Sequence, residues 1–418
     1  MSVIFVTCRI NFRIHLMLKI GLIREGKKIP DTRVALTPEQ CAVITNTYPD
    51  IRIVVESSPN RCYTDQEYTA QHIPVVTDVS DCDILLGIKE VPIPSLIPGK
   101  TYFFFSHTKK KQPYNQDLMK AMIAERITMI DYETLTYDDG ARIIGFGFYA
   151  GVVGAHNGLL TYGMKSKKYN LIPAHLCRDK KEMLQQYNHV KLPPMKIVVT
   201  GSGKVAAGIL DILHSWDIKN IEPEDFLGQS YDYPVYTHLK GHDLYQHKDG
   251  EHFNRSEFHE HPERYKCVFG PYTRTADILM HGIYWNDKID AMFRAEDIRD
   301  RDFTLQVIAD ITCDPFGSIP INVGASTITQ PVYGIDRKSG QQTVPFLPSD
   351  ISVDVMAVDN LPNELPRDAS EHFGEHMIKY IIPELLKEES EMLDRATICK
   401  DGRLTSYFDY LADYAYGE

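Results

Sequence analysis

The sequence contains no pair of cysteines at the C-x-x-C spacing, although eight cysteines are scattered through its 418 residues. A chain of this length does not need disulfide bonds to form a core, so reduced thiols and a cytoplasmic location are expected. No apolar run reaches membrane-spanning length, so no membrane partner is expected. Basic residues are outnumbered, with 45 Lys and Arg against 57 Asp and Glu. Binding to nucleic acid through backbone electrostatics is therefore not expected either.

Internal repeats and low-complexity tracts are also absent, and the length predicts two domains. Residues 1–16, MSVIFVTCRINFRIHL, mix apolar residues with Arg9, Arg13 and His15 and lack a clean signal-peptide pattern. Because Met17 is a natural start into a first strand, we interpret residues 1–16 as an N-terminal extension. A weak targeting peptide is the rival interpretation.

The first part of the chain alternates short apolar runs with helix-compatible stretches. The predicted strands are 18–24, 51–56, 83–88, 101–106 and 127–131. Helices are predicted at 37–48 and 114–125, and an apolar helix at 148–164 leaves this domain. Strands that alternate with helices indicate a parallel α/β sheet.

A second alternating unit begins at Met195, after the polar stretch 167–193. Strands are predicted at 196–200, 266–269, 278–284, 305–309 and 353–358, with a helix at 204–215. A long helix at 366–390 is expected to return to the first domain. The predicted fold is therefore α/β, with two Rossmann-like, doubly wound parallel-sheet domains around an interdomain cleft.

The polar segment 228–265 contains six histidines, at 238, 242, 247, 252, 259 and 261. A zinc site requires ligands at short, fixed spacing on ordered elements. Here the spacing is irregular and the composition is loop-like. We therefore predict a solvated insert and no metal, with zinc as the less favoured interpretation.

The stretch KIVVTGSGKVAAGILDIL (196–213) places a glycine turn between a predicted strand and a predicted helix. The turn Gly201-Ser202-Gly203, with Ala206 at the third position, fits the pattern G-x-G-x-x-G/A. The pyrophosphate of a dinucleotide would bind at the helix N-terminus. A tight turn without a ligand is the simpler interpretation.

The acid expected to bind the adenosine ribose follows such a turn after about 20 residues. Glu222 lies 21 residues after Gly201 and favours NAD. NADP stays open, because Lys204 or Lys219 could accept its phosphate.

Three charged or titratable residues stand at or near the ends of predicted strands in the first domain: Arg33, Lys89 and His107. Ligands bind at the carboxyl ends of strands in open α/β sheets. A lysine and a histidine that face one cleft can act as an acid/base pair. Each residue alone is more simply explained as a surface charge.

Several motifs together resemble the alanine dehydrogenase/transhydrogenase superfamily, and more closely its saccharopine-forming branch. In the first half they are R-x-A-L-T-P, G-x-K-E-x-P, S-H-x-x-K, D-Y-E and GARIIGFGFYAG. In the second half they are HPERY, HGIYW, DITCD, VDNLP and LPRDASEHFG. HPERY followed by GIYW is similar to the lysine–2-oxoglutarate reductase portion of bifunctional lysine-degrading enzymes. The resemblance covers Met17 to about Leu386.

The resemblance implies an acid/base pair, Lys89 and His107, and a substrate-binding domain at 17–157 joined by 366–418. Five further residues would line the substrate cleft: Arg33, Lys110, Glu133, Arg142 and Phe146. Among them the arginines match groups that bind carboxylates, and Glu133 matches a group that sets the charge of the catalytic lysine. The dinucleotide domain at 158–365 would use Gly201, Ser202, Gly203, Ile283, Tyr284, Asp310 and Asp314, with Asn360 near the nicotinamide.

The implied activity is interconversion of saccharopine with L-lysine and 2-oxoglutarate by hydride transfer with NAD or NADP. Single-function relatives usually carry two arginines where this chain has Ala141-Arg142, which puts one cofactor contact in doubt. No second catalytic domain follows, so a bifunctional activity is not implied. The alternatives are alanine dehydrogenase, another amino-acid dehydrogenase acting on a different oxo acid, and a non-catalytic dinucleotide-binding sensor.

Overall fold

The computed structural model describes residues 17–27 and 31–417, and the chain forms two compact units. Unit 1 contains the chain up to Ile144 and again from Ser370, and unit 2 is Gly145–Ala369. The proposed extension at 1–16 lies outside the described residues. Within the described ranges, no helix is both long enough and apolar enough to cross a membrane.

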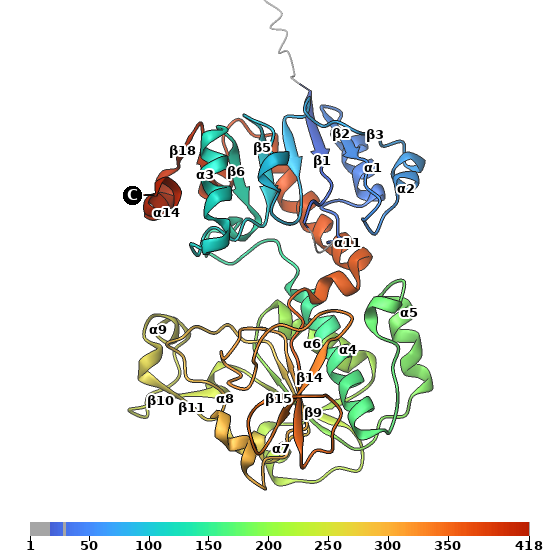
Figure 1. Cartoon of the computed structure of the whole chain (residues 1–418), viewed down its shortest axis with the longest axis vertical. Coiled ribbons are helices and arrows are strands. Elements are labelled where there is room, and N and C mark those ends of the chain that lie inside the picture. The colour runs from blue at the N-terminus through green and yellow to red at the C-terminus, as the bar shows by residue number, and fades with distance from the viewer. Residues whose placement is uncertain (1–16, 28–30, 418) are drawn as a thin grey trace, which may run out of the picture. The chain divides into compact units, whose positions relative to one another are not determined.

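Unit 1 is built on an eight-stranded sheet with the order β18-β17-β6-β5-β4-β1-β2-β3 (Figure 1). Its strands are β1 (Leu18–Leu22), β2 (Ile51–Glu56), β3 (Val75–Val76), β4 (Ile84–Leu86), β5 (Thr101–Phe104), β6 (Thr128–Asp131), β17 (Thr397–Lys400) and β18 (Arg403–Leu404). Pairing is parallel from β3 to β6, and β17 and β18 add an antiparallel edge. The strand order reverses direction between β1 and β4, which is the switch point of a doubly wound sheet.

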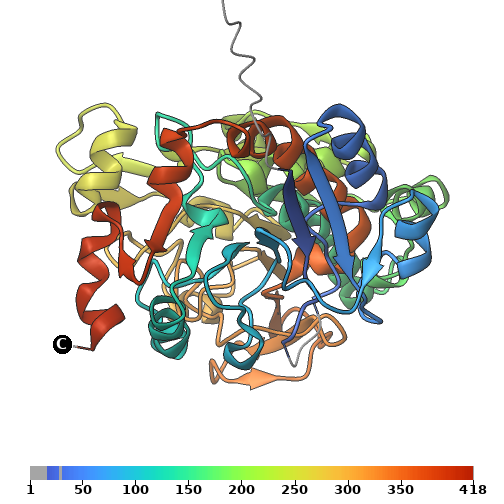
Figure 2. The same cartoon turned by 90° about the horizontal axis from the view of Figure 1, so that it is seen from above.

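The helices of unit 1 begin where the sequence supplies caps. Helix α1 (Pro38–Thr47) starts after Thr37, whose hydroxyl accepts the N–H of Gln40 while the Gln40 side chain accepts the N–H of Thr37. Helix α2 (Asp65–Ala70) lies beside α1 and the blue strands, as Figure 2 shows. Helix α3 (Gln116–Ala124) follows β5. The helices predicted at 37–48 and 114–125 are confirmed.

Unit 2 is built on a second eight-stranded sheet, with the order β15-β14-β16-β13-β12-β7-β9-β8. Its strands are β7 (Lys196–Thr200), β8 (Lys219–Asn220), β9 (Val235–Leu239), β12 (Ile278–His281), β13 (Val307–Asp310), β14 (Val332–Asp336), β15 (Gln342–Thr343) and β16 (Ser352–Met356). Six strands are parallel, and β14 and β15 form an antiparallel edge. The predicted α/β class with two parallel-dominated sheets is confirmed.

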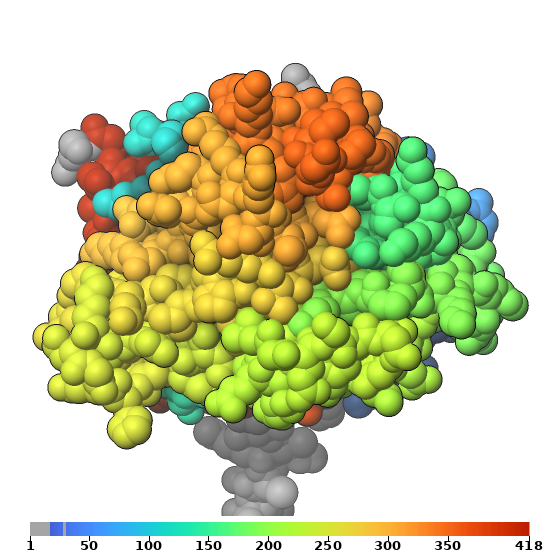
Figure 3. Space-filling view, turned by 90° about the horizontal axis from the view of Figure 1, so that it is seen from below, coloured from blue at the N-terminus to red at the C-terminus, as the bar shows by residue number. Residues whose placement is uncertain are grey.

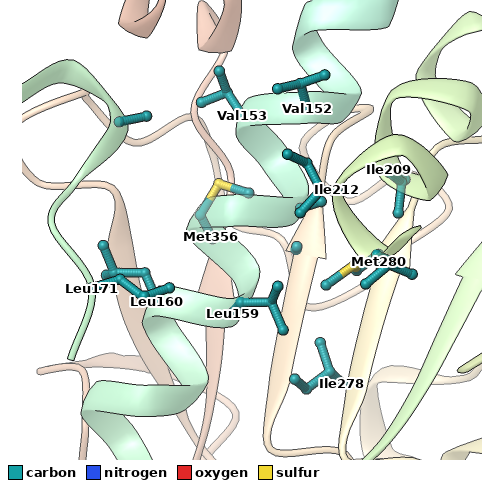
Figure 4. Close-up of a cluster of buried hydrophobic side chains, with 14 of the residues drawn as sticks. Val152, Val153, Leu159, Leu160, Leu171, Ile209, Ile212, Ile278, Met280 and Met356 are labelled. Atoms are coloured by element: carbon teal, nitrogen blue, oxygen red, sulfur yellow. The ribbon is translucent and has the colours of Figure 1, made fainter. Parts of the chain in front are cut away.

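Helices α4 (Gly147–Ser166) and α6 (Lys204–Ser215) approach each other at backbone distance. A Cβ on Gly151 would lie 2.0 Å from the carbonyl oxygen of Val205, and one on Gly208 would lie 2.0 Å from that of Phe148. Both helices pack on the sheet through the buried cluster in Figure 4. Because α4 is held in this way, it belongs to unit 2. The division therefore falls at 144/145, whereas the sequence suggested 157/158.

The histidine-rich segment 228–265 is not a loop. It contains β9, α8 (Gly241–Leu244), β10 (Tyr245–His247) and α9 (Arg255–Glu260). Strand β9 lies next to β7 and four of its five residues are buried. The strand predicted at 266–269 is β11 (Tyr265–Cys267), which pairs with β10 outside the main sheet. Figure 3 shows this yellow segment at one side of unit 2.

The long helix predicted at 366–390 is a helical path of three parts. Helix α11 (Pro366–His376) continues through a π-helical turn at Met377–Ile381 into α12 (Ile382–Leu385). The path ends five residues before the predicted end. The chain then returns to the sheet of unit 1 through α13 (Glu391–Ala396) and β17.

Candidate active site

In unit 1, Lys89 follows β4 and His107 follows the neighbouring parallel strand β5. Glu90 joins the two positions, because its Oε1 lies 2.7 Å from His107 Nδ1. The same oxygen accepts a 3.0 Å hydrogen bond from Asn115 Nδ2, and the Lys27 ammonium pairs with Oε2. The structure thus brings Lys89 and His107 to one edge of the sheet, around a buried carboxylate.

The backbone of His107 has a positive φ of 52°, which is uncommon for a residue other than glycine. Its neighbours hold this conformation. The backbone N–H and the hydroxyl of Ser106 both donate to the buried carboxylate of Asp131, and the Ser106 and Thr108 hydroxyls share a 2.7 Å hydrogen bond. Strained backbone that is stabilised by its surroundings is typical of functional sites.

Burial and neighbouring charge shift the titration of two groups here. Burial, followed by the positive charge of Arg33, lowers the pKa of Lys89. Burial alone would raise the pKa of Glu90, but hydrogen bonds from His107, Lys27 and Asn115 outweigh it and hold that pKa well below its usual range. Glu90 is therefore ionised at neutral pH, next to a lysine that gives up its proton more readily than a free lysine does.

The two predicted carboxylate-binding arginines have different surroundings. Arg33 is only 4% exposed, and its Nε donates to Asp31 Oδ1 at 2.9 Å. Arg142 is half exposed and lies 3.3 Å from the carboxylate of Glu133. Arg142 is therefore the more open of the two to a ligand.

The other two predicted substrate residues, Lys110 and Phe146, belong to different units. Lys110 is exposed in the turn that follows His107. Phe146 lies immediately before α4 and belongs to unit 2.

Sequence reasoning assigned no role to four residues of this cluster: Glu25, Asp31, Glu90 and Asn115. Glu25 follows β1, and its carboxylate accepts hydrogen bonds from the backbone N–H groups of Ile88 and Lys89. Burial raises the pKa of Glu25 to about 7. Glu90 follows Lys89 in the motif G-x-K-E-x-P, and Asp31 precedes Arg33 by two residues. Closeness in sequence to these motifs could have identified both residues as members of the site.

The glycine turn of unit 2 has the backbone that a pyrophosphate requires. Gly201 has φ of +109°, and a Cβ there would lie 2.3 Å from the carbonyl oxygen of Gly282. A Cβ on Gly203 would meet no atom within 4 Å, so the space above Gly203 is open. Helix α6 begins at Lys204 and directs its first N–H groups toward this turn. The turn therefore fits a dinucleotide phosphate.

Glu222 does not lie where a ribose-binding acid is expected. It follows the edge strand β8 and stands at the N-cap position of α7 (Pro223–Gly228), without a side-chain capping hydrogen bond. Strand β9 separates its strand from β7. The residue that follows β9, which pairs with β7, is Lys240, and it is exposed. The spacing pointed to Glu222 because β9, the strand that pairs with β7, lies within the segment 228–265 that was interpreted from sequence as an insert. His238 of the same strand contacts the turn, with its Nε2 2.6 Å from the Gly201 carbonyl oxygen.

The other predicted dinucleotide residues follow β12, β13 and β16. Ile283 and Tyr284 are in the loop after β12, and the Tyr284 side chain is 64% exposed. Asp314 is exposed beyond β13, and Asn360 stands before the short helix Leu361–Glu364.

Asp310 differs from these residues because it is fully buried at the end of β13. It accepts hydrogen bonds from Thr312, Cys313 and Asn322. Asp310 therefore holds the loop after β13 in place through these hydrogen bonds.

The described residues contain no group of three or more His, Cys, Asp or Glu side chains arranged to hold a metal ion.

Residues 21–153 match the family model described as Alanine dehydrogenase/PNT, N-terminal domain. The chain is 30% identical to an alpha-aminoadipic semialdehyde synthase of Arabidopsis thaliana, with 94% of this chain and 41% of that protein covered. It is 24% identical to a saccharopine dehydrogenase [NAD(+), L-lysine-forming] of Yarrowia lipolytica, with 87% of this chain and 92% of that protein covered. The chain thus spans less than half the length of the semialdehyde synthases it matches.

The fold is similar to that of a solved L-alanine dehydrogenase, with a TM-score of 0.63 and 15% sequence identity. The match covers 96% of this chain and 99% of that structure. At this identity the likeness establishes the fold. The chain is thus similar in sequence to L-lysine-forming saccharopine dehydrogenases and to alpha-aminoadipic semialdehyde synthases, and its N-terminal part matches the alanine dehydrogenase/transhydrogenase family model.

Proposed function

We propose that the chain is a nicotinamide-dinucleotide-dependent oxidoreductase that interconverts saccharopine with L-lysine and 2-oxoglutarate. The observation that carries the proposal is the cluster of Lys89, Glu90 and His107 at the ends of β4 and β5. The open glycine turn of unit 2 supports the dinucleotide.

In this proposal, Lys89 and His107 move the protons of imine formation. The amine of lysine adds to the keto carbon of 2-oxoglutarate, and the resulting carbinolamine loses water to give an imine. These steps need a group that accepts a proton from the attacking nitrogen and a group that donates one to the departing hydroxyl. The lowered pKa of Lys89 increases its neutral, proton-accepting fraction. Glu90 orients His107 through the Nδ1 contact, leaving Nε2 for the substrate.

The bound dinucleotide would supply a hydride to the carbon of the imine, whose nitrogen carries a proton, and this gives the secondary amine of saccharopine. The chain's own residues hold the substrate for that step. Arg142 is the accessible guanidinium for a substrate carboxylate, because Arg33 is buried against Asp31. A guanidinium binds a carboxylate with two parallel hydrogen bonds, which fixes its orientation.

For the dinucleotide we propose NADP, in place of the NAD that Glu222 suggested. The residue after β9 is Lys240, and the first acid beyond it, Asp243, accepts the backbone N–H of Lys240 at 2.8 Å as a helix cap. A basic residue at this place suits a 2′-phosphate, whereas a free carboxylate would suit a ribose hydroxyl.

Replacing Lys240 tests the choice of dinucleotide. We expect Lys240→Asp to raise the KM for NADPH by about tenfold or more, because a charge-assisted hydrogen bond to phosphate is lost. The KM for NADH should change little. Lys248→Asp, an exposed lysine beyond β10, is the matched control. An unchanged preference in Lys240→Asp would contradict the assignment.

The activity itself is tested by following absorbance at 340 nm. Purified protein receives NADPH or NADH with lysine plus 2-oxoglutarate, and separately with pyruvate plus ammonium. Oxidation that needs both lysine and 2-oxoglutarate supports the proposal. Oxidation only with pyruvate and ammonium would assign the chain as an alanine dehydrogenase. Dinucleotide binding without turnover would favour a sensor, or a dehydrogenase for another oxo acid.

A further inference from the structure

Glu25 holds the backbone that carries Lys89. Its Oε1 accepts the N–H of Ile88 at 2.7 Å, and its Oε2 accepts the N–H of Lys89 at 2.9 Å. Both oxygens of one carboxylate are thus used by two consecutive amides. Charge-assisted hydrogen bonds of this kind are shorter and stronger than those between neutral groups.

The Glu25 carboxylate lies just beyond the point where β1 and β4 stop pairing. Leu22 is the last residue of β1 that pairs with β4, and the N–H of Ile23 donates to the carbonyl of Leu86. Beyond this point β1 no longer supplies carbonyl acceptors to the chain that follows β4. The Glu25 side chain takes over that role. On the opposite side, the N–H of Phe105 donates to the carbonyl of Ile88, which ties the same chain to β5.

A small cavity of about 20 Å³ adjoins the carboxylate. This volume is about that of a single water molecule. Five charged residues line it: Arg24, Glu25, Asp31, Arg33 and Arg61. The carboxylate therefore has polar neighbours but little access to bulk solvent.

We infer that Glu25 is a positioning residue for the proposed acid/base lysine: its carboxylate clamps the amides of Ile88 and Lys89 and so fixes the point from which the Lys89 side chain extends. The inference rests on the proposed function for the role of Lys89. The clamp requires the ionised carboxylate, because a protonated oxygen is a donor and accepts an amide N–H poorly. The clamp is therefore sensitive to pH.

The direction of that sensitivity follows from the surroundings of the carboxylate. Burial, and more weakly the negative charge of Asp31, raises the pKa of Glu25 to about 7, against the lowering effect of the Ile88 and Lys89 amides and Arg33. The other charged or titratable groups near it are Arg24, Arg61 and Tyr68, which line the same cavity, and Tyr132. The clamp should be complete well above pH 7 and weaken as the pH falls through 7.

Hydrogen–deuterium exchange of the full-length protein tests the clamp without relying on turnover. In Glu25→Ala, exchange at the amides of Ile88 and Lys89 should rise about tenfold or more, as expected when hydrogen bonds to a charged group are lost. Glu25→Gln keeps one acceptor oxygen and the side-chain volume, so it should fold and show a smaller rise. Glu56→Gln is the matched control, because Glu56 binds Arg24 instead of this loop.

Competitive acetylation of Lys89 separates positioning from a merely structural role. We expect the labelling rate of Lys89 to change in both Glu25 variants and to stay constant in Glu56→Gln. Unchanged exchange in Glu25→Ala, or changed exchange with constant Lys89 labelling, would overturn the inference. If the wild-type protein fails to turn over lysine and 2-oxoglutarate, the proposed function fails, while exchange and labelling still decide the role of Glu25.

Discussion

The surroundings of the proposed acid/base residues, Lys89 and His107, differ. Lys89 is held in a poorly solvated place beside the positive charge of Arg33, which favours its neutral form. His107 has a strained backbone, and its ring is anchored by the ionised Glu90. One carboxylate therefore orients the histidine while its charge also acts on the lysine.

Replacing either residue should impair turnover. We expect Lys89→Met and His107→Gln each to lower kcat by at least ~10-fold, in line with general acid–base contributions. Lys120→Met, on the exposed side of α3, should retain normal activity. The assay is oxidation of NADPH with lysine and 2-oxoglutarate, alongside circular dichroism to verify folding. Near-normal kcat in both variants would contradict the assigned roles.

The lowered pKa of Lys89 also has a consequence for stability. A lysine whose pKa is lower in the fold than its ordinary 10.5 binds fewer protons there than in the unfolded chain. Its charge therefore weakens the fold below the folded pKa, and this penalty disappears as the pH rises towards 10.5. Lys89→Met should have a higher Tm than the wild type at pH 7, and the gap should close near pH 10. A gap that grows with pH would show that the charged lysine stabilises the fold.

At the scale of elements, the two glycines of the turn serve different purposes. Gly201 is required by its positive φ and by the close carbonyl of Gly282, so its role is in the folded backbone itself. Gly203 meets nothing within 4 Å, so its missing side chain matters only when a ligand approaches. In the proposed function, the same motif thus combines one structural glycine with one that leaves room for the dinucleotide.

Two valine substitutions distinguish these roles. Gly203→Val should fold with a Tm near that of the wild type and lose most of its dinucleotide affinity, because the side chain fills the space that the phosphate needs. Gly201→Val should lower the Tm, with a cost of a few kcal/mol from strain and overpacking. Calorimetric titration with NADPH and thermal unfolding measure the two effects. Tight NADPH binding by Gly203→Val would show that the turn has only a structural role.

Elements with a strong local pattern could be predicted from sequence, and those defined by tertiary neighbours could not. Strands 51–56 and 196–200 are apolar runs and were predicted at their observed bounds. Strand β9 was missed because Thr237 and His238 make its sequence polar, although Thr237 is buried in the sheet. Glu25 was missed for the same kind of reason: a glutamate after an apolar run resembles a surface charge until the loop after β4 folds against it.

At the scale of the whole molecule, each unit has its own core, but only unit 2 is continuous in sequence. The core of unit 1 includes C-terminal residues that pack against β5, β6 and α3, among them Ile398, Cys399, Phe408 and Leu411. Strand β17 also covers the edge of β6. Unit 1 is therefore completed only when the C-terminal segment has folded onto it, whereas unit 2 does not depend on that segment for its core.

Because only unit 1 depends on the C-terminal segment, we expect a disruptive substitution there to abolish turnover and to preserve dinucleotide binding. Ile398 is fully buried, so Ile398→Asp places an unpaired charge in the core of unit 1 and should cost more than about 4 kcal/mol there. Turnover of lysine and 2-oxoglutarate should be lost, while NADPH binding to unit 2 should stay within about twofold of the wild type, since that core is untouched. Lys400→Asp, exposed on the same strand, is the control and should preserve both. Loss of NADPH binding in Ile398→Asp would mean that unit 2 needs a folded unit 1, because the substitution lies outside the residues that build the dinucleotide turn.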